Sequence, residues 1–489
     1  MHSTQKSQGD GPPPPETGLW GWLNRRTGLD TLLKTALYEP IPGGARLAYV
    51  FGSGLLFIFI SQVITGVFLA LYYVPSADHA HTTVAYITKA VTAGSFLRSL
   101  HAYGSSAMVI VLLLHLSQTY IYGAYKGRRE LLWLSGCVLL GLVLAMAFTG
   151  YLLPWDQKAY FATAVGTNAA SEIPWIGESL KRMMRGGTEM GTLTISRFFV
   201  AHVFLIPACI FALVASHIFL FRKAGAAGPV NENPYEPEQK PELFYPRQVL
   251  MDLSLTALLI IGLGLLCFLA PMQLGPPANS ADAQYIPRPE WYYLPIFQWL
   301  KYWHGAASLM GVLILPTVLA LAIIALPFLD RSIERRPWKR PVAMGAYAFV
   351  LFALLGLGLR SQYVDKHDPG VARQLAKQKT EEEEYMRKPF EPELSSASLA
   401  AANVALADPL AAKGKTIFEA QSCNACHGDD GVGTAAAPAL VGIAAKSPPA
   451  QLAELLKHPT AKMNAGGMPP VDLPPDDLKA LIAYVESFK

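Results

Sequence analysis

Residues 98–116 read RSLHAYGSSAMVIVLLLHL and place two histidines, His101 and His115, in an apolar stretch long enough to cross a bilayer. A second apolar stretch carries another pair, His202 and His217. The second histidine thus stands at i+14 in the first pair and at i+15 in the second. At about 100° per residue the paired side chains lie roughly 40° and 60° apart, on one face of each helix. A rise of about 1.5 Å per residue separates the members of each pair by about 21–22 Å along the axis.

One histidine on an apolar helix is usually a packed, hydrogen-bonded core residue, but four in two matched pairs predict cofactor ligation. Ionisable residues at membrane depth are costly and usually functional. Two facing helices with this spacing would bracket two planar cofactors stacked across the membrane, each bound by one histidine from either helix. Imidazole suits iron, and the span of the pairs excludes a simple zinc cage. We therefore predict two haem b groups with bis-histidine ligation.

Four glycines repeat the histidine spacing on two further apolar helices. Gly66 stands at i+14 from Gly52, and Gly150 stands at i+14 from Gly136. Membrane helices use glycine for packing in general, so either pair alone is a weak signal. Because glycine lets a backbone approach a large flat ligand closely, two pairs at this spacing favour haem packing against both helices.

The composition indicates a polytopic membrane protein. Of the 489 residues, 52% are hydrophobic and only 16% are charged, whereas a soluble domain has about 25% charged residues. The net charge of +4, without a basic tract, gives no support for nucleic-acid binding.

Lipid leaves backbone groups no partner outside their own segment, so we predict an all-α fold. Seven segments have the roughly 20 mostly apolar residues that a spanning helix needs. They cover about residues 47–74, 99–122, 131–153, 198–221, 248–270, 307–328 and 342–360.

Basic residues in the connecting segments predict the orientation. Segments on the N-terminal side of the membrane hold seventeen Lys and Arg, and those on the opposite side hold nine. Positive charge marks the cytoplasmic side. We therefore expect residues 1–46 in the cytoplasm and, after seven crossings, the C-terminus outside. Residues 1–46 lack the apolar core of a signal peptide, so membrane entry is expected to rely on the first spanning helix.

The chain changes character after the last apolar segment. Residues 361–405 are polar and predict a partly helical linker. Residues 406–489 then form a small domain that contains the only CxxC of the chain, in the string Cys423-Asn-Ala-Cys426-His427. CxxCH is a haem-attachment motif. The two thiols would add covalently to the porphyrin of one haem c, and the adjacent histidine would become the proximal iron ligand.

A redox or zinc-binding CxxC is the competing interpretation of this motif. The sequence holds no second metal-binding cluster, and the domain is expected outside, where haem c is attached. Met468, in Gly-Gly-Met-Pro, is the predicted sixth iron ligand, and Met463 is the alternative. A thioether ligand raises the potential of a haem iron.

Three stretches resemble the cytochrome b family of the quinol-oxidising bc complexes. They are RSLHAYGSSAMVIVLLLHL at 98–116, TGYLLPWDQKAYFATAVGTN at 149–168 and RFFVAHVFLIP at 197–207. The i+15 step from His202 to His217, and a break near 225–245 followed by three helices, resemble the chloroplast-type b6f branch. The resemblance covers about residues 20–360. It implies a four-helix di-haem bundle at 47–225 and a three-helix part at 226–360, and residues 406–489 resemble a small all-α class I cytochrome c.

The resemblance assigns roles to charged residues and to the histidine pairs. His101 and His202 would bind the haem near the outer face, and His115 and His217 the haem near the inner face. Arg98 and Arg197 match positions near the haem propionates, where a guanidinium offsets carboxylate charge. Arg222 and Lys223 match the inner face, close to a quinone-reducing site. Val50 stands where chloroplast-type proteins carry a cysteine that tethers an extra haem, so no covalently held third membrane haem is expected.

The loop IPRPEWYYLPIFQWLKYW at 286–303 carries a single acid, Glu290, among aromatic and proline residues. Its aromatic residues alone would suit a membrane-interface belt. Quinol oxidation releases two protons, however, so a carboxylate at the membrane edge is a suitable base. The string PEWY resembles the signature of the family's outer quinol-oxidising site. It implies Glu290 as proton acceptor and Tyr292 as a residue that shapes the site, with ubiquinone, plastoquinone and menaquinone all open.

Together these resemblances imply a proton-translocating subunit of a quinol:cytochrome c oxidoreductase. One electron from quinol would cross both haem b groups and reduce quinone at the inner face. The other would reach the fused haem c through a Rieske iron–sulfur protein, which must be another polypeptide, and pass on to a cytochrome c or terminal oxidase. We expect a dimeric complex in the bacterial cytoplasmic membrane. The alternative is a di-haem membrane anchor that relays electrons between a quinone pool and a periplasmic enzyme without bifurcation.

Overall fold

The computed structural model describes residues 18–231, 241–390, 408–428, 431–433, 437–445, 447–465 and 467–488. The chain divides into two units, Met1–Phe390 and Glu391–Lys489. Within the described ranges the only sheet is a two-residue antiparallel pair, β1 (Pro40–Ile41) with β2 (Glu242–Leu243). Nearly all other regular structure is helical, which confirms the predicted all-α class.

Six helices among the described residues are long and apolar enough to cross a membrane. They are η1 with α3 (Leu47–Ala70), α5 (Gly94–Ile121), α6 (Glu130–Tyr151), α9–η2–α10 (Thr192–Ala224), α11 (Arg247–Leu269) and α15 (Pro341–His367). Each matches one of the predicted apolar segments. The predicted count of seven is not confirmed, because the segment at 307–328 forms no single long helix.

That segment consists of a shorter apolar helix, Met310–Ile324, made of the π-turn η4 (Met310–Ile314) and α13 (Leu315–Ile324), followed by α14 (Leu326–Leu329). The interruption falls at Ala325, two residues before Pro327. Proline has no N–H to donate to the carbonyl four residues earlier. The carbonyl left over, on Ile323, accepts a hydrogen bond of 2.8 Å from the indole N–H of Trp133 on α6. The Trp133 side chain thus supplies the hydrogen bond that Pro327 cannot donate.

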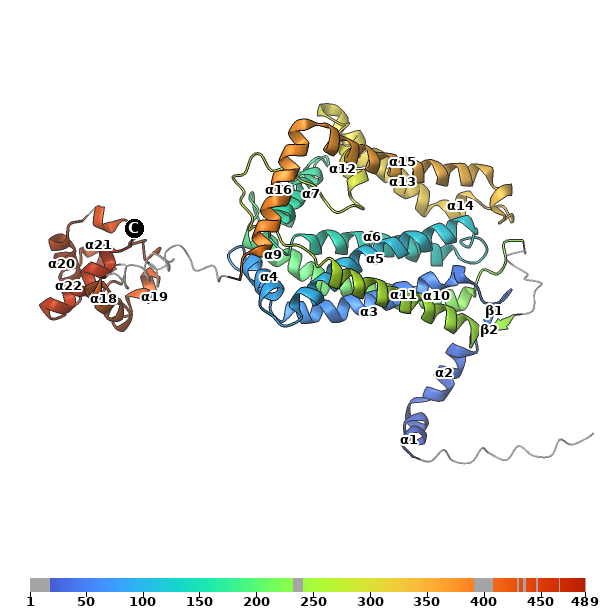
Figure 1. The fold of residues 1–489 in the computed structure, drawn as a ribbon, viewed down its shortest axis with the longest axis horizontal. Helices are drawn as coiled ribbons and strands as arrows, with labels where there is room; N and C mark the ends of the chain where they lie inside the picture. The colour runs from blue at the N-terminus through green and yellow to red at the C-terminus, as the bar shows by residue number, and fades with distance from the viewer. Residues whose placement is uncertain are drawn as a thin grey trace, which may run out of the picture. The chain divides into compact units, whose positions relative to one another are not determined.

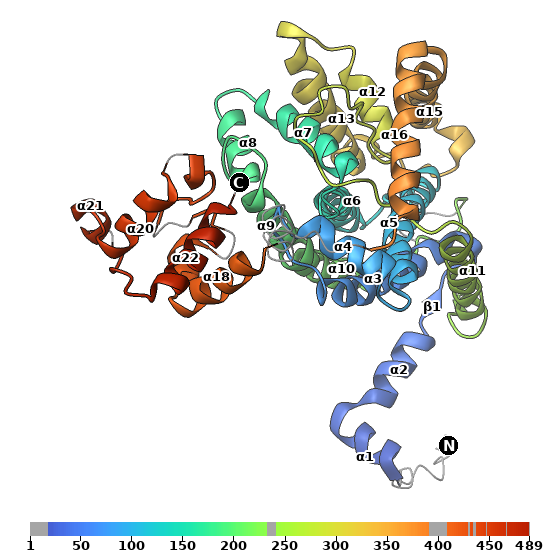
Figure 2. The same cartoon turned by 60° about the vertical axis from the view of Figure 1, so that its left-hand side comes forward.

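Four of the long helices form the bundle that positions the histidines. α3 packs along α5, and α6 packs along α10, as Figure 1 shows from the side and Figure 2 from another angle. α11 adds a fifth helix against α3 and α5. Apolar side chains from three of these helices fill the bundle between the His101–His202 pair and the His115–His217 pair. The buried members of this cluster are Ile58, Phe59, Met108, Val111, Ile206 and Ile210.

The fourth helix contains a π-helical turn, η2 (Ala201–Leu205), between α9 (Thr192–Val200) and α10 (Ile206–Ala224). His202 lies inside this turn, and Pro207 follows it. A π-turn accommodates one residue more than a regular α-turn. The i+15 step to His217 therefore corresponds in space to an i+14 step along a regular α-helix, which matches the spacing on α5. The larger angular offset that we expected for this pair assumed a regular α-helix, which residues 201–205 do not form.

The first unit also contains shorter helices. They are α1 (Gly18–Thr27), α2 (Leu29–Leu37), α4 (Ala80–Lys89), α7 (Gln157–Ser171), α8 (Gly177–Arg185), α12 (Leu294–Leu300), η3 (Gly305–Ala307), η5 (Pro337–Lys339) and α16 (Pro369–Arg387). Asp156 caps α7 by accepting a hydrogen bond from the Ala159 N–H, and Asp368 caps α16 in the same way. Residues 361–387, in the predicted linker, are thus helical and belong to the first unit.

The second unit is a small helical domain. Its elements are α18 (Pro409–Ala420), α19 (Cys423–His427), η6 (Ile443–Ala445), α20 (Pro449–Lys457), α21 (Ala461–Ala465) and α22 (Pro475–Glu486). α18 packs on α22 at Gly414, where an added Cβ would lie 2.0 Å from the Ala480 carbonyl oxygen, so only glycine permits this approach. Phe418, Tyr484 and Phe488 pack edge to face in the core beside it.

Candidate functional site

The imidazoles of His101 and His202 face each other across the bundle. Their ring centroids are 6.1 Å apart and their planes are inclined by 79°. A metal–imidazole bond is about 2 Å long, so two such bonds to one iron span about 4 Å. The distance from each bonding nitrogen to its ring centre supplies the rest of the 6.1 Å between the centroids. The pair therefore fits bis-histidine ligation of one haem iron.

Hydroxyl groups hold the ring nitrogens that point away from the pair. The Nδ1 atom of His101 lies 2.9 Å from Oγ1 of Thr65, and Nδ1 of His217 lies 2.8 Å from Oγ of Ser135. Nδ1 of His202 lies 3.0 Å from the Met146 carbonyl oxygen and 3.4 Å from Oγ1 of Thr149. Such partners fix the orientation of a metal-binding imidazole and leave Nε2 for the iron.

Each of the four predicted glycines lies opposite one of the four histidines. A Cβ added to Gly150 would lie 2.3 Å from Cε1 of His202, and one on Gly66 would lie 3.2 Å from Cε1 of His101. The corresponding distances at the second histidine pair are 3.4 Å from Gly136 to His217 and 3.9 Å from Gly52 to His115. The glycines thus make room for the imidazoles, which is a more specific role than the approach to a flat ligand that we expected.

The hydroxyl residues were missed by sequence reasoning, although a signal was present. Thr65, Ser135 and Thr149 each immediately precede one of the four glycines. Consecutive residues of a helix point about 100° apart. The glycine can therefore leave space for the imidazole while the hydroxyl of the residue before it forms a hydrogen bond with Nδ1. Phe51 precedes the remaining glycine and breaks the pattern opposite His115.

A cavity of about 330 Å³ adjoins the His101–His202 pair. It is lined by both histidines, by Gly66 and Gly150, and by charged and polar side chains. These include Arg98, Tyr151, Asp156, Lys158, Gln273, Glu290, Tyr292 and Glu382. The structure therefore brings the outer histidine pair and the predicted proton acceptor Glu290 to one cavity.

Glu290 is paired with a cation that sequence reasoning did not select. Nζ of Lys158, in the first turn of α7, lies 2.8 Å from Oε1 of Glu290, and both side chains are about one-third exposed. Burial disfavours the charged amine, but the Glu290 carboxylate together with Asp156 and Glu382 outweighs this effect and raises the pKa of Lys158 above its ordinary value. Lys158 directly follows the string TGYLLPWDQ, so its position in a site-forming segment was the available signal.

Several contacts fix the loop that carries Glu290. The guanidinium of Arg288 binds the carboxylate of Asp365 on α15, with Nε 2.9 Å from Oδ2. The hydroxyl of Tyr293 donates to the Leu144 carbonyl on α6 at 2.7 Å. Tyr292, also lining the cavity, has its pKa raised by burial and by the nearby Glu290, so its phenol stays protonated. A carboxylate held this way keeps a fixed position relative to the histidine pair.

The predicted arginines lie in different surroundings. Arg98 lines the cavity, but its guanidinium donates to the Met272 and Gln273 carbonyls at 3.0 and 2.8 Å. Arg197 donates to the carbonyls of Arg182 and Met183 and is not among the cavity-lining residues. The structure thus gives both side chains protein partners at the end of the bundle that carries His101 and His202.

At the other end of the bundle, the predicted quinone-site cations also have protein partners. Arg222 forms an ion pair with Glu39, with NH1 2.8 Å from Oε2. Nζ of Lys223 lies 5.7 Å from the centre of the Phe219 ring. Both residues are in the last turn of α10.

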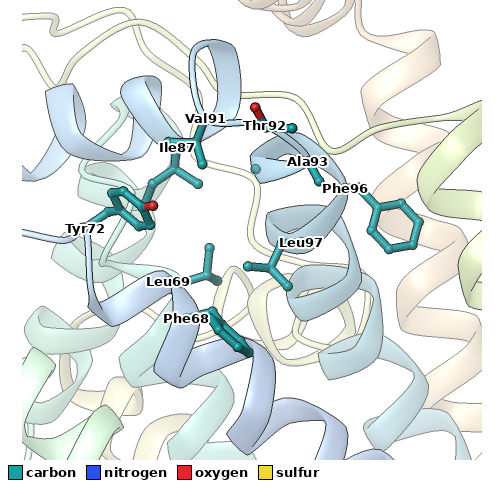
Figure 3. A pocket seen from close by; sticks show the side chains of 10 residues that line it. Phe68, Leu69, Tyr72, Ile87, Val91, Thr92, Ala93, Phe96 and Leu97 are labelled. Carbon is teal, nitrogen blue, oxygen red and sulfur yellow. The ribbon is translucent and has the colours of Figure 1, made fainter.

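A second hollow of about 230 Å³ lies where the end of α3, α4 and the start of α5 meet. Figure 3 shows Phe68, Leu69, Ile87 and Leu97 turned toward it, and none of its lining residues is charged. It therefore offers no acid–base chemistry.

The CxxCH motif of the second unit forms the short helix α19. Nδ1 of His427 lies 2.9 Å from the Pro438 carbonyl oxygen, which orients the ring and leaves Nε2 as the predicted iron ligand. Cys423 packs against the apolar core of this unit. The Met468 N–H donates to the Met463 carbonyl at 3.1 Å, so the two candidate sixth ligands belong to one turn of chain.

A bundle of membrane-length helices with paired, oriented histidines defines a membrane-bound haem protein. Family models match residues 37–225 ("Cytochrome b/b6/petB"), residues 277–376 ("Cytochrome b(C-terminal)/b6/petD") and residues 411–489 ("Cytochrome c"). The chain belongs to the cytochrome b family and carries a cytochrome c domain at its C-terminal end. These domains imply haem b and haem c as cofactors.

Individual relatives agree with this assignment. The chain is 33% identical to the cytochrome bc complex cytochrome b subunit of Chlorobaculum thiosulfatiphilum, over 69% of this chain and 78% of that protein. It is 36% identical to the menaquinol:cytochrome c reductase cytochrome b subunit of Bacillus subtilis, over 43% of this chain and 98% of that protein. A solved structure described as hyperthermophilic respiratory Complex III superposes with a TM-score of 0.62 and 26% identity, over 73% of this chain and 95% of that one.

Proposed function

We propose that this chain is the cytochrome b–c subunit of a quinol:cytochrome c oxidoreductase that oxidises quinol at the outer cavity. The observation that carries the proposal is the cavity itself, which adjoins the His101–His202 pair and contains the Lys158–Glu290 ion pair. Relatives named as cytochrome bc complex and menaquinol:cytochrome c reductase subunits support this activity.

Quinol oxidation needs a proton acceptor and an electron acceptor at the same place. Glu290 supplies the carboxylate, which accepts a proton from a quinol hydroxyl as the O–H bond breaks. Lys158 gives that carboxylate a counter-charge and a hydrogen bond of 2.8 Å, which hold it at the edge of the cavity. The Arg288–Asp365 contact holds the loop that carries the carboxylate.

The histidines supply the binding sites for the electron-transfer groups. His101 with His202 would hold one haem b and His115 with His217 another, while Cys423, Cys426 and His427 would hold haem c with Met468 as its sixth ligand. When bound, these groups accept and pass on single electrons. Thr65, Ser135 and Thr149 orient three of the four membrane imidazoles.

Bifurcation, proton translocation and the partners belong to the same proposal. With haem bound at both histidine pairs, one electron of each quinol would be delivered to quinone near Arg222 and Lys223. The other would reach the haem c held by Cys423, Cys426 and His427 through a Rieske iron–sulfur subunit. The complex is a dimer in the bacterial cytoplasmic membrane, with its N-terminus inside and the haem c domain outside, as the seventeen-to-nine distribution of basic residues favours.

The test is quinol:cytochrome c turnover by the purified complex, with and without inhibitors of the outer and inner quinone sites. Glu290→Gln keeps the size of the side chain and removes its charge. We expect turnover to fall about 100-fold, since a positioned general base contributes about 10²–10⁴-fold. Unchanged turnover in Glu290→Gln would exclude the outer-site assignment. Turnover that responds to only one class of inhibitor would favour the di-haem membrane anchor instead.

A further inference from the structure

The helix α16 extends beyond the part of the chain that matches the cytochrome b family models. The C-terminal cytochrome b match ends at residue 376, and the cytochrome c match begins at residue 411. The second half of α16, residues 377–387, therefore belongs to the segment that joins the two domains. It includes a run of four glutamates, Glu381 to Glu384.

α16 is anchored to the outer end of the bundle rather than free. Nζ of Lys89, at the end of α4, donates to the carbonyls of Tyr385 and Lys388 and lies 3.9 Å from the centre of the Tyr385 ring. Tyr385 and Met386 pack on buried apolar side chains of α4 and on Leu274. Gln378 donates to the Ile286 carbonyl at 3.5 Å, beside the Glu290 loop. These contacts place one face of α16 over the quinol cavity.

Glu382 is the residue of the glutamate run that reaches this cavity. It is half-buried and lines the same space as Glu290, Lys158 and the outer histidine pair. Its neighbours in the run point elsewhere: Glu381 and Glu383 form exposed pairs with Lys377 and Lys379 on α16 itself. Glu384 is exposed.

The charges around Glu382 leave it able to take up a proton. Burial raises the pKa of Glu382 above its ordinary value, Lys158 and Arg98 oppose that shift, and Asp156 and Glu290 add to it. The titratable and charged groups that act on it from the packed elements are Arg98 on α5, Asp156 and Lys158 at the start of α7, and Tyr285 and Glu290 in the loop before α12. His81 and Lys89 on α4 contact Tyr385, on the same helix as Glu382. A carboxyl group in this setting exchanges a proton nearer neutral pH than an exposed glutamate does.

We propose that Glu382 is a second proton acceptor of the quinol cavity, which takes the proton released at Glu290 and delivers it to water at the outer face. The inference rests on the proposed quinol oxidation. In the step, the O–H bond of protonated Glu290, or of a water that it protonates, breaks, and an O–H bond forms at a carboxylate oxygen of Glu382. The proton then leaves to bulk water. No electron moves, and Glu290 returns to the carboxylate that pairs with Lys158.

The test compares Glu382→Gln, Glu382→Asp and the matched control Glu384→Gln in the full complex. Glu384→Gln removes the same charge from the same helix at an exposed position. The measurement is the rate at which quinol reduces the haems, followed across mildly acidic to mildly alkaline pH, with haem spectra to verify folding. For Glu382→Gln we expect a rate about tenfold lower and loss of the acidic limb of the pH profile. Glu382→Asp should recover part of the rate, and Glu384→Gln should match the unsubstituted protein.

Two outcomes would overturn the inference while leaving the proposed function intact. One is a wild-type rate and pH profile in Glu382→Gln when Glu290→Gln is slow. The other is an equal slowing of Glu382→Gln at every pH, because a purely structural role lowers the rate without moving the profile. If Glu290→Gln is also as fast as the unsubstituted protein, it is the proposed function that fails.

Discussion

Nζ of Lys158 lies 2.8 Å from Oε1 of Glu290, across 132 residues of sequence and at the edge of the cavity that adjoins the outer histidine pair. The contact joins the start of α7 to the loop before α12. It gives the predicted proton acceptor a cationic partner.

Replacement of Lys158 by Met should slow quinol-driven haem reduction about tenfold, because Glu290 loses the hydrogen-bonded counter-charge that holds it in place. Lys158→Arg should retain most of the rate. Rapid-mixing absorbance of the haem b bands measures both. Lys181→Met, which removes a lysine of α8 with a 3.9 Å contact to Glu178, is the control and should be neutral. A neutral Lys158→Met would show that the ion pair has no part in turnover.

Alanine at the four bundle glycines should impair haem binding in a graded order. The order follows the distance from the added Cβ to the facing imidazole: Gly150 at 2.3 Å, Gly66 at 3.2 Å, Gly136 at 3.4 Å and Gly52 at 3.9 Å. Gly150→Ala should lose the outer haem b, and Gly52→Ala should keep both. Gly141→Ala, on the same helix as Gly150, meets nothing within 4 Å and is the control. A pyridine haem assay gives the haem b content, and equal losses in Gly52→Ala and Gly150→Ala would contradict the order.

Removal of the Ser135 hydroxyl should weaken the inner haem b site alone. Ser135→Ala takes away the 2.8 Å partner of His217 Nδ1, and such losses typically lower metal affinity by about 10- to 100-fold. Low-temperature spectra and redox titration separate the two haem b signals. Thr256→Val serves as the control, because the Thr256 hydroxyl donates to the Asp252 carbonyl within α11 and faces no histidine. A change in the outer haem signal instead would refute the assignment of Ser135 to the inner site.

Asp330 should stabilise the loops at the end of the bundle opposite the quinol cavity. Its carboxylate lies 2.6 Å from both Nζ of the buried Lys126 and the Tyr125 hydroxyl. Burial alone would raise its pKa, but these hydrogen bonds hold the pKa of Asp330 below the ordinary value. Asp330→Asn should lower the free energy of unfolding by about 3 kcal/mol, because a buried ammonium loses its counter-charge.

The pH dependence of this contribution has a definite sign. A carboxyl group whose pKa is lower in the folded state stabilises the fold above its unfolded pKa, about 3.9 for Asp, and loses that effect as pH falls through the folded value. Thermal unfolding of the two proteins should therefore converge at strongly acidic pH. Glu178→Gln, in an exposed pair, should unfold like the unsubstituted protein at all pH values.

Substitution of Met468 by Leu should remove the sixth ligand of haem c and lower its midpoint potential, since a thioether ligand raises it. Met463→Leu is the matched control from the same turn and should leave the potential unchanged. Haem staining after denaturing electrophoresis should show covalent haem in both variants and none in Cys423→Ala with Cys426→Ala. If Met463→Leu alone lowers the potential, the ligand assignment is reversed.

Sequence spacing predicted the histidine pairs because an i+14 or i+15 step along one apolar helix keeps both side chains on a common face. It did not predict the π-turn at Ala201–Leu205, since a local spacing does not reveal how a helix is wound. It likewise placed an apolar segment at 307–328, but not the interruption at Ala325 that Pro327 imposes and Trp133 accommodates.

The amino-acid sequence by itself determined the all-α class, the four histidines with their glycines, the haem c motif and Glu290. Each of these can be recognised from residue types and their spacing within one segment. Only the tertiary structure placed Lys158 on Glu290 and turned Glu382 of α16 toward the same cavity. Periodicity defines which face of one helix is apolar, but contacts between residues far apart in sequence depend on how helices and loops pack. The charge arrangement of the cavity is therefore a property of the fold.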